Sequence, residues 1–312
     1  MKFAIIGTGG VGGYFGARLH QAGEEVIFLA RGKHLQALRK NGLQLHSIHG
    51  DYHAPTVTAH DHLPDIGPVD VGLVATKAWQ VPEIAPDLQP LMQDGTFVVP
   101  LQNGVEAAGQ LASALGAERV VDGLCGVMAF IEAPGVIRHA AYDPFITFGE
   151  TDGQRSERVE VLDAVLSKCH AVQSKPTEEI EKAVWEKFLF ISAFSGVGGV
   201  TRMPIGAIRR VPETRKLLDD ALQEVLALAQ ARGVGLEEQN VEQAWRIFDS
   251  LPYEVTASMQ RDVMDGRPSE LESQTGAIVR LAQEANVTTP INQFIYQSLL
   301  PTELQARGEL EI

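Results

Sequence analysis

The stretch Lys2-Phe3-Ala4-Ile5-Ile6-Gly7-Thr8-Gly9-Gly10-Val11-Gly12 decides the fold of the first half of the chain. Its apolar run predicts a strand over residues 2–6, and residues 11–22 predict a helix. The glycines between them match G-x-G-x-x-G. In this pattern the first glycine makes a turn, the second lets the backbone approach a pyrophosphate, and the third lets the helix pack against the strand. We therefore expect a dinucleotide to bind Gly7, Thr8, Gly9, Gly10, Val11 and Gly12. The alternative is a glycine-rich turn without a ligand.

Strands and helices continue to alternate after this motif. Apolar runs predict strands at 25–29, 69–75 and 96–99, and helical spacing with an early proline, Pro82, predicts a helix over 81–92. This alternation indicates an α/β fold with a parallel, doubly wound sheet of the Rossmann type. Strand-like pieces over 122–150 are compatible with antiparallel strands that extend the sheet, and a helix is expected over 156–170.

The second half of the chain has helical patterns almost throughout. Helices are expected over 178–195, 213–232, 236–249, 253–264 and 270–284. The segment 173–177 predicts a boundary, and a length of 312 residues suits two domains. We therefore expect a dinucleotide-binding Rossmann domain over 1–175 and an all-helical substrate and catalytic domain over 176–312.

Charge and cysteine content exclude several classes of function. Lys and Arg number 26 and Asp and Glu 40, so the formal charge is −14, which repels nucleic acid and acidic membrane surfaces. An anionic ligand then needs local cations. The two cysteines lack the spacing of a disulfide framework or zinc site. The apolar start is too short for a signal peptide, and the longest uncharged stretch, 285–302, is too polar to span a membrane. A cytoplasmic protein is expected.

The end of the second predicted strand indicates which nicotinamide cofactor binds. Sites that prefer NAD place an acidic residue there to bind the ribose 2′-hydroxyl. Here the strand ends in Ala30-Arg31, with Lys33 close behind. A guanidinium can hold a 2′-phosphate with two hydrogen bonds. The sequence therefore predicts NADPH, with a solvated Arg31 as the alternative.

Four further segments resemble the ketopantoate reductase (2-dehydropantoate 2-reductase) family in order and spacing. They are Thr76-Lys77-Ala78-Trp79-Gln80, Gln102-Asn103-Gly104, Trp185-Glu186-Lys187-Phe188, and Ser258-Met259-Gln260-Arg261-Asp262 with Ser269-Glu270. The resemblance extends from Met1 to about Ala285. It implies NADPH-dependent reduction of 2-dehydropantoate to pantoate, a step of pantothenate and coenzyme A biosynthesis.

The resemblance also implies roles for individual residues. Lys187 matches the catalytic lysine, and Asn103 matches an asparagine beside the nicotinamide and the substrate. Ser258 and Glu270 match substrate-binding residues, and Lys77 matches a lysine near the cofactor and substrate. The chemistry agrees, because hydride arriving at a keto carbon leaves an alkoxide that needs a proton donor and a positive partner.

Each of these residues also has a purely structural interpretation. Lys187 could be a helix lysine with a buried stem. Ser269 and Glu272 form a capping-box pattern, so Glu270 would occupy a first helical turn, where acids are favoured anyway. Ser258 could be a helix-surface hydroxyl, and Lys77 and Asn103 could be ordinary loop residues. These loops follow strands, however, at the edge where parallel sheets bind ligands.

Two positions depart from the better-known members of the family. Asparagines that follow the catalytic lysine at i+4 and i+8 are Ile191 and Ser195 here, on the same helix face as Lys187. We expect Ser195 to contact substrate. Because isoleucine cannot form a hydrogen bond, a more apolar 2-oxo acid is the alternative substrate, and an inactive NADPH-binding sensor is the alternative from another class.

The remaining expectations concern metals and assembly. Five histidines, His46, His49, His53, His60 and His62, lack the paired helical spacing of zinc enzymes and are interpreted as strand and loop residues. The expected partner is a small 2-oxo acid. The sequence leaves open whether the chain forms a homodimer.

Overall fold

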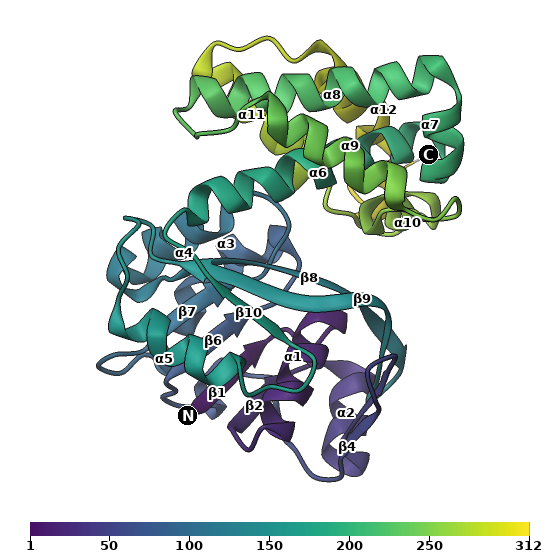
Figure 1. Cartoon of the computed structure of the whole chain (residues 1–312). Coiled ribbons are helices and arrows are strands. Elements are labelled where there is room, and N and C mark those ends of the chain that lie inside the picture. The colour runs from purple at the N-terminus through teal and green to yellow at the C-terminus, as the bar shows by residue number, and fades with distance from the viewer. Residues whose placement is uncertain (312) are drawn as a thin grey trace. The chain divides into compact units, whose positions relative to one another are not determined.

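The computed structural model describes residues 1–311 and divides the chain into two compact units (Figure 1). The first unit comprises Met1–Gln102 and Glu106–Ile180. The second comprises Asn103–Val105 and the chain from Glu181 onward. Along the chain the unit changes inside the first turn of helix α6 (Ile180–Thr201), whereas the sequence places the division at 175. Each unit is described by itself below.

A parallel sheet forms the centre of the first unit, as predicted, although one of its five strands, the edge strand β5, was not predicted. Its strand order is β5-β2-β1-β6-β7, and every neighbouring pair is parallel. Strands β6 and β7 are buried along their whole length, and β1 is buried after its first residue, because their residues are apolar on both faces. The strands are β1 (Lys2–Ile6), β2 (Glu25–Leu29), β5 (Thr58–His60), β6 (Val71–Val74) and β7 (Phe97–Pro100).

A second sheet of five strands was not predicted. Strands β8 and β9 pair antiparallel as a long hairpin (Figure 1), and β9 also pairs in parallel with β3 and β10. The strand pieces over 122–150 therefore belong to this separate sheet instead of extending the first one. The expected boundary segment 173–177 contains one of its strands. The strands are β3 (Leu43–Ser47), β4 (Tyr52–Ala54), β8 (Asp122–Ala133), β9 (Val136–Gly149) and β10 (Gln173–Pro176).

Helix α1 (Gly10–Gln21) packs closely against both sheets because glycines stand where it meets each of them. A Cβ on Gly16 would lie 2.4 Å from the Phe28 ring of β2, and a Cβ on Gly13 would lie 2.6 Å from Ile137 of β9. Glycine at these two positions therefore sets how near the helix approaches each sheet.

The other helices of the first unit are short. They are α2 (Gly32–Asn41), α3 (Val81–Ile84), α4 (Ala107–Leu115), α5 (Glu157–Leu166), and the 3₁₀ turns Leu63–Asp65, Ala78–Gln80, Pro86–Leu91 and Ala117–Arg119. The helix predicted over 81–92 is α3 followed by a 3₁₀ turn. Pro86 and Pro90 cannot donate the backbone hydrogen bonds that a continuous α-helix requires.

The second unit is helical, as predicted. Besides α6 it contains α7 (Ile205–Arg210), α8 (Pro212–Ala231), α9 (Glu238–Ser250), α10 (Ser258–Met264), α11 (Ala277–Ala285) and α12 (Pro290–Ala306). Helices α7 and α12 were not predicted. The helix expected over 253–264 begins only at Ser258. The helix expected over 270–284 is replaced at its start by a π-helical turn, Glu272–Gly276, before α11.

Helix α6 is the core helix of this unit. It has 22 residues and contains an 18-residue stretch with a mean hydropathy of 1.2, so it would suffice to cross a membrane by length and composition. However, 67% of the apolar stretch is buried inside the structure, as in the central helix of a globular domain. Phe188 and Leu189 of α6 are each 1% exposed and pack in one cluster with Phe248 of α9.

Candidate functional site

The glycine loop joins β1 to α1 at the carboxyl edge of the parallel sheet. Gly7 has φ +101°, a value that side chains disfavour, and a Cβ there would lie 2.8 Å from the Thr76 backbone nitrogen. Thr8 donates both its N–H (3.0 Å) and its hydroxyl (2.9 Å) to the Leu29 carbonyl. The loop is therefore fixed to the ends of both neighbouring strands, β2 and β6.

The space around the glycines fits a dinucleotide pyrophosphate. A Cβ on Gly9 would have no atom within 4 Å, so the backbone is open to a ligand there. A Cβ on Gly12 would lie 2.2 Å from the Gly7 carbonyl oxygen, so this glycine permits close packing of helix and strand. Gly10 packs in the same way on Ala129 of β8. The first amides of α1 have no acceptor within the helix, and a helix N-terminus favours anions.

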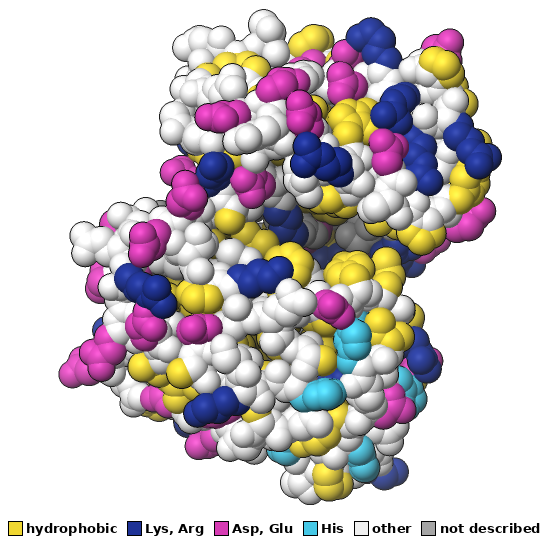
Figure 2. Space-filling view, in the orientation of Figure 1, with side chains coloured by type: hydrophobic (Ala, Val, Ile, Leu, Met, Phe, Trp, Pro, Cys, Tyr) yellow, Lys and Arg dark blue, Asp and Glu magenta, His cyan; other side chains and the backbone are white. Residues whose placement is uncertain are grey.

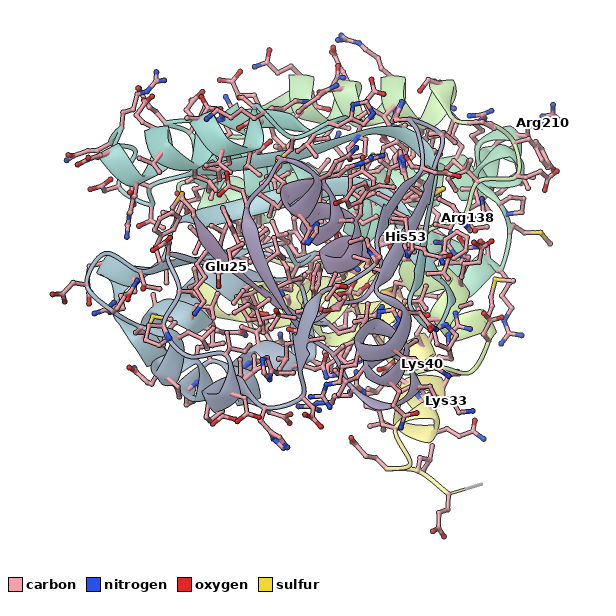
Figure 3. All side chains as sticks on the ribbon, turned by 90° about the horizontal axis from the view of Figure 1, so that it is seen from below. Glu25, Lys33, Lys40, His53, Arg138 and Arg210 are labelled. Atoms are coloured by element: carbon pink, nitrogen blue, oxygen red, sulfur yellow. The ribbon has the colours of Figure 1, made fainter. Side chains whose placement is uncertain are left out.

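Arg31 lies at the end of β2 as the N-cap residue of α2 and is exposed. Within residues 1–311 its guanidinium forms no ion pair, and neither does the exposed Lys33 at the start of α2 (Figure 3). Beside them, His34 accepts the Gly135 N–H at its Nδ1 (3.1 Å), and burial lowers the pKa of His34. Arg31 and Lys33 are thus available to an anionic ligand, in a protein whose total charge is strongly negative.

The loops after β6 and β7 complete this edge of the sheet. The Gln102 side-chain amide donates to the carbonyls of Val74 (2.9 Å) and Thr76 (3.1 Å), so it joins the ends of the two strands. Lys77 is exposed on the loop after β6, with its Nζ 5.6 Å from the centre of the Trp79 ring. Gln102 is the first residue of the Gln102-Asn103-Gly104 motif, but its role in joining the two strand ends was not predicted.

Asn103 and Glu270 meet in the second unit. The Asn103 Nδ2 donates to the Glu270 carboxylate at 3.0 Å, across 167 residues of sequence. The Gln274 amide lies on the same carboxylate oxygen at 3.4 Å. Glu270 is 6% exposed. Gln274 was not predicted, although its i+4 spacing from Glu270 would have pointed to it.

The turn around Glu270 differs from the predicted capping box. Ser269 and Glu272 do not cap one another. Glu272 instead accepts the Tyr296 hydroxyl (2.5 Å) and pairs with Arg280 (2.9 Å). Burial, followed by the hydrogen bond to Glu272, raises the pKa of Tyr296 to about 12. The predicted box does not form because Glu303 of α12, instead of Glu272, accepts the Ser269 N–H.

Glycine is also required beside this turn. Gly104 has φ +111°, and a Cβ there would lie 2.7 Å from the Ser273 carbonyl oxygen. The Asn103-Gly104 pair therefore packs directly against the turn that follows Glu270, which explains why a glycine follows the asparagine.

The other predicted residues of this unit lie on two helices. Lys187 is half-buried on α6, before the buried Phe188. Ser195 is 0% exposed, and within residues 1–311 its hydroxyl has no hydrogen-bond partner. Ser258 is half-buried as the first residue of α10. Gln260 stabilises the amino end of this helix, because its side chain accepts the Ala257 N–H (3.3 Å) and donates to the Met203 carbonyl (3.0 Å).

Comparison with known proteins assigns the family. The family model for ketopantoate reductase PanE/ApbA matches residues 3–153, and the model for its C-terminal domain matches residues 179–303. The chain belongs to the ketopantoate reductase family. It is 30% identical over 301 residues to the uncharacterized oxidoreductase YkpB of Bacillus subtilis, covering 96% of this chain and 98% of that protein. A 2-dehydropantoate 2-reductase of Mesorhizobium japonicum is 29% identical, with 93% and 94% covered.

Solved structures agree with this assignment. A 2-dehydropantoate 2-reductase from Geobacter metallireducens superposes with a TM-score of 0.90 at 29% identity, covering 98% of this chain and all of that one. A D-mandelate dehydrogenase with NADH and anilino(oxo)acetate has a TM-score of 0.89 at 21% identity, which shows a shared fold. This ketopantoate reductase family member is therefore an oxidoreductase.

The histidines of this family member lie in the first unit, where Figure 2 shows several of them on one face. His46, His53 and His60 lie in strands β3, β4 and β5, and His49 and His62 lie in loops. No group of three or more metal-ligating side chains is arranged to hold a metal within residues 1–311.

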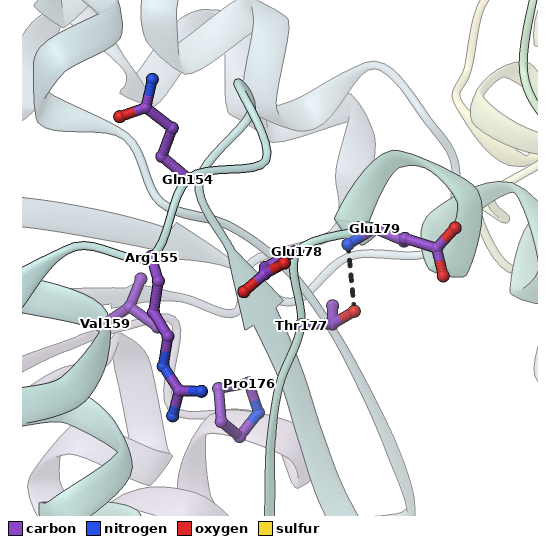
Figure 4. Close-up of a pocket in the computed structure, with 7 residues that line it drawn as sticks. All are labelled: Gln154, Arg155, Val159, Pro176, Thr177, Glu178 and Glu179. Carbon is purple, nitrogen blue, oxygen red and sulfur yellow. Dashed lines mark hydrogen bonds between the residues drawn. The ribbon is translucent and has the colours of Figure 1, made fainter.

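A cavity of about 430 Å³ lies on the first unit (Figure 4), and its lining includes no residue of the glycine loop. Thr177 accepts the Glu179 N–H there at 3.1 Å, just before α6 begins. The lining contains two carboxylates against one guanidinium and includes none of the predicted site residues: Gln154, Arg155, Val159, Pro176, Thr177, Glu178 and Glu179.

Proposed function

We propose that this protein reduces 2-dehydropantoate to pantoate with NADPH, the reaction that supplies pantoate for pantothenate and coenzyme A. The cofactor supplies a hydride to the keto carbon. The chain must then provide a proton for the oxygen, charge stabilisation during the transfer, and polar partners that orient the substrate. Each of these requirements has a candidate residue in the second unit.

The Asn103–Glu270 hydrogen bond is the observation that carries this proposal. It brings together two residues that the family resemblance assigns to the substrate site and that no local pattern connects. Glu270 is largely buried, so its carboxylate would orient a hydroxyl of the substrate with little competition from water. Asn103 would then hold Glu270 in place and bind the substrate beside it.

Lys187 is proposed as the proton donor. Its ammonium would stabilise the alkoxide that forms at the keto oxygen and then protonate it. Ser258 and Ser195 are proposed as further substrate partners, although Ser195 lies inside the core of the unit in this structure. A substrate contact from Ser195 would therefore require α6 or its neighbours to move.

NADPH is proposed over NADH because of Arg31. The guanidinium is exposed at the end of β2 with no ion pair within residues 1–311, and Lys33 lies two residues later. A 2′-phosphate carries two negative charges that these cations would bind, while β2 ends in Ala30-Arg31 without an acidic residue to bind a 2′-hydroxyl. The glycine loop, with Lys77 and Asn103, completes the proposed set of cofactor residues.

Ile191 favours a second candidate substrate, a small 2-oxo acid with a more apolar substituent. Ile191 is half-buried one helical turn after Lys187 and packs against the apolar core of the unit. It offers no hydrogen bond at a position one turn from the proposed proton donor. A substrate with a hydroxyl there would lose about 1–3 kcal/mol if that group remained unpaired.

The test is NADPH oxidation with 2-dehydropantoate and a panel of 2-oxo acids. We expect Lys187→Ala to lower kcat by about 10²–10⁴-fold, as for loss of a general acid. The Kd for NADPH should stay unchanged. Lys182→Ala, which removes another half-buried lysine of α6, is the matched control and should keep wild-type kcat.

Three outcomes would revise the proposal. A near-normal kcat for Lys187→Ala removes this lysine from the mechanism. A much larger kcat/KM for another acid identifies that acid as the substrate. NADPH binding without turnover of any acid favours a cofactor-binding sensor. The proposed location is the cytoplasm, in accord with a chain of 312 residues that contains only two cysteines, both of them buried.

A further inference from the structure

A buried carboxylate on the last helix holds the residue that precedes Glu270. Glu303 of α12 is 2% exposed, and its two oxygens accept the Ser269 backbone N–H at 3.0 Å each. Oε2 also accepts the Ser269 hydroxyl at 2.5 Å. One carboxylate therefore binds both donors of Ser269, which is itself 0% exposed.

Arg307 completes this arrangement one helical turn later. Its guanidinium lies 2.7 Å from Glu303 Oε1 and donates to the Ser269 carbonyl at 3.1 Å. The backbone of Ser269 is thus held on both its donor and acceptor sides. We call Glu303 and Arg307, with these bonds to Ser269, the Ser269 clamp.

The chain is equally constrained after Glu270. The Glu270 carbonyl accepts the Gln274 N–H (3.0 Å) as the π-helical turn begins. Leu271, which is 0% exposed, donates its N–H to the Ser269 hydroxyl (3.3 Å). Glu270 therefore lies between the Ser269 clamp and a fixed turn, with its carboxylate directed to the Asn103 amide.

We propose that Glu303, with Arg307, is a positioning residue that sets the Glu270 carboxylate for the substrate. This inference rests on the proposed function, because it assigns substrate binding to Glu270. A binding group must be held within about 0.5 Å and 10–20° of its productive geometry. The clamp fixes the backbone one residue away from Glu270, so a shift at Ser269 moves the Glu270 side chain directly.

The same unit contains a matched control for a purely structural role. Glu224 of α8 accepts the backbone N–H groups of Ile291 (2.7 Å) and Asn292 (2.9 Å) at the opposite end of α12. It also accepts the Asn292 side-chain amide (2.7 Å). Glu224 thus resembles Glu303 in chemistry and binds the same helix, but it does not contact the segment around Glu270.

The experiment compares Glu303→Gln with Glu224→Gln in the full chain, with Arg307→Lys as a milder variant in case Glu303→Gln folds poorly. Both Gln variants should lower Tm. Only Glu303→Gln and Arg307→Lys should raise the KM for 2-dehydropantoate, by about tenfold for Glu303→Gln, which corresponds to about 1.4 kcal/mol. The Kd for NADPH should stay within twofold in all three.

A second readout does not depend on turnover. The Asn103 side-chain amide, observed by NMR in protein with ¹⁵N-asparagine and assigned with Asn103→Ser, should shift in Glu303→Gln and not in Glu224→Gln. If Glu303→Gln changes neither this signal nor KM beyond the control, the inference is wrong. If wild type does not reduce 2-dehydropantoate, the proposed function fails, and the amide signal alone decides whether Glu303 positions Glu270.

Discussion

Gly9 and Gly12 belong to one motif but should respond differently to a single methyl group. Gly9→Ala places a Cβ where no atom lies within 4 Å, so the folded protein can accept it. Gly12→Ala places a Cβ 2.2 Å from the Gly7 carbonyl oxygen and 2.8 Å from Ile5 Cγ2. Because backbone cannot move away as a flexible side chain does, Gly12→Ala must displace either α1 or β1.

The expected magnitudes follow from these contacts. Overpacking of this kind costs about 1–3 kcal/mol, and a domain of this size loses about 2–4 °C in Tm per kcal/mol. Gly12→Ala should therefore lower Tm by about 2–12 °C. Gly9→Ala should keep a nearly wild-type Tm but raise the Kd for NADPH at least tenfold, since the methyl group occupies the space through which the pyrophosphate would approach.

The assay is a thermal melt of each variant with and without NADPH, together with titration of NADPH fluorescence. Wild type should be stabilised by the cofactor through mass action, and Gly9→Ala should lose this stabilisation at the same NADPH concentration. Wild-type NADPH affinity in Gly9→Ala would refute the assignment of the loop to the pyrophosphate. A wild-type Tm for Gly12→Ala would refute the packing argument.

Two further predictions concern the start of α2. Arg31→Ala should lower kcat/KM for NADPH by about tenfold or more and leave kcat/KM for NADH nearly unchanged, since only NADPH offers a 2′-phosphate. Lys40→Ala, an equal loss of charge at the far end of α2 (Figure 3), should leave the ratio of the two kcat/KM values unchanged. An unaltered ratio in Arg31→Ala would exclude Arg31 from the cofactor site. For His34, burial lowers the pKa below its ordinary value of 6.5, so the unfolded chain binds the proton first and stability falls as the pH drops below 6.5. Protonation also removes the acceptor of the Gly135 N–H, whereas the Oδ1 of His34→Asn can still accept it. Urea unfolding should therefore show that the free energy of unfolding falls between pH 7 and pH 5 by on the order of 1 kcal/mol more in wild type than in His34→Asn. Equal losses in the two proteins would show that His34 does not contribute.

Much of the first unit could be predicted because its signals are local. The parallel sheet follows from short apolar runs separated by helical patterns, and the glycine loop follows from the spacing of glycines between β1 and α1. The second sheet could not be predicted in the same way. Strand β9 pairs with β3, about ninety residues earlier (Gln44 with Val136), and no local pattern specifies that register.

The candidate site shows the same division. The resemblance to the ketopantoate reductase family drew attention to Asn103 and Glu270 separately, but their hydrogen bond exists only because the folded unit brings them together across 167 residues. The predicted capping box failed at Ser269 because Glu303, 34 residues later, supplies a carboxylate that Glu272 was expected to provide. Likewise, the burial of Ser195 depends on the neighbours of α6, which sequence spacing does not reveal.

The sequence by itself determined the Rossmann-type sheet, the helical second half, the glycine loop between β1 and α1, and the family. These depend on residue periodicity and on glycine positions within a few residues of each other. Only the tertiary structure decided which polar groups far apart in the sequence are partners: Gln102 with two strand ends, Asn103 with Glu270, and Glu303 with Ser269. The physical reason is that a buried polar group must find a hydrogen-bond partner in space, and for groups far apart along the chain the sequence does not specify which of them meet.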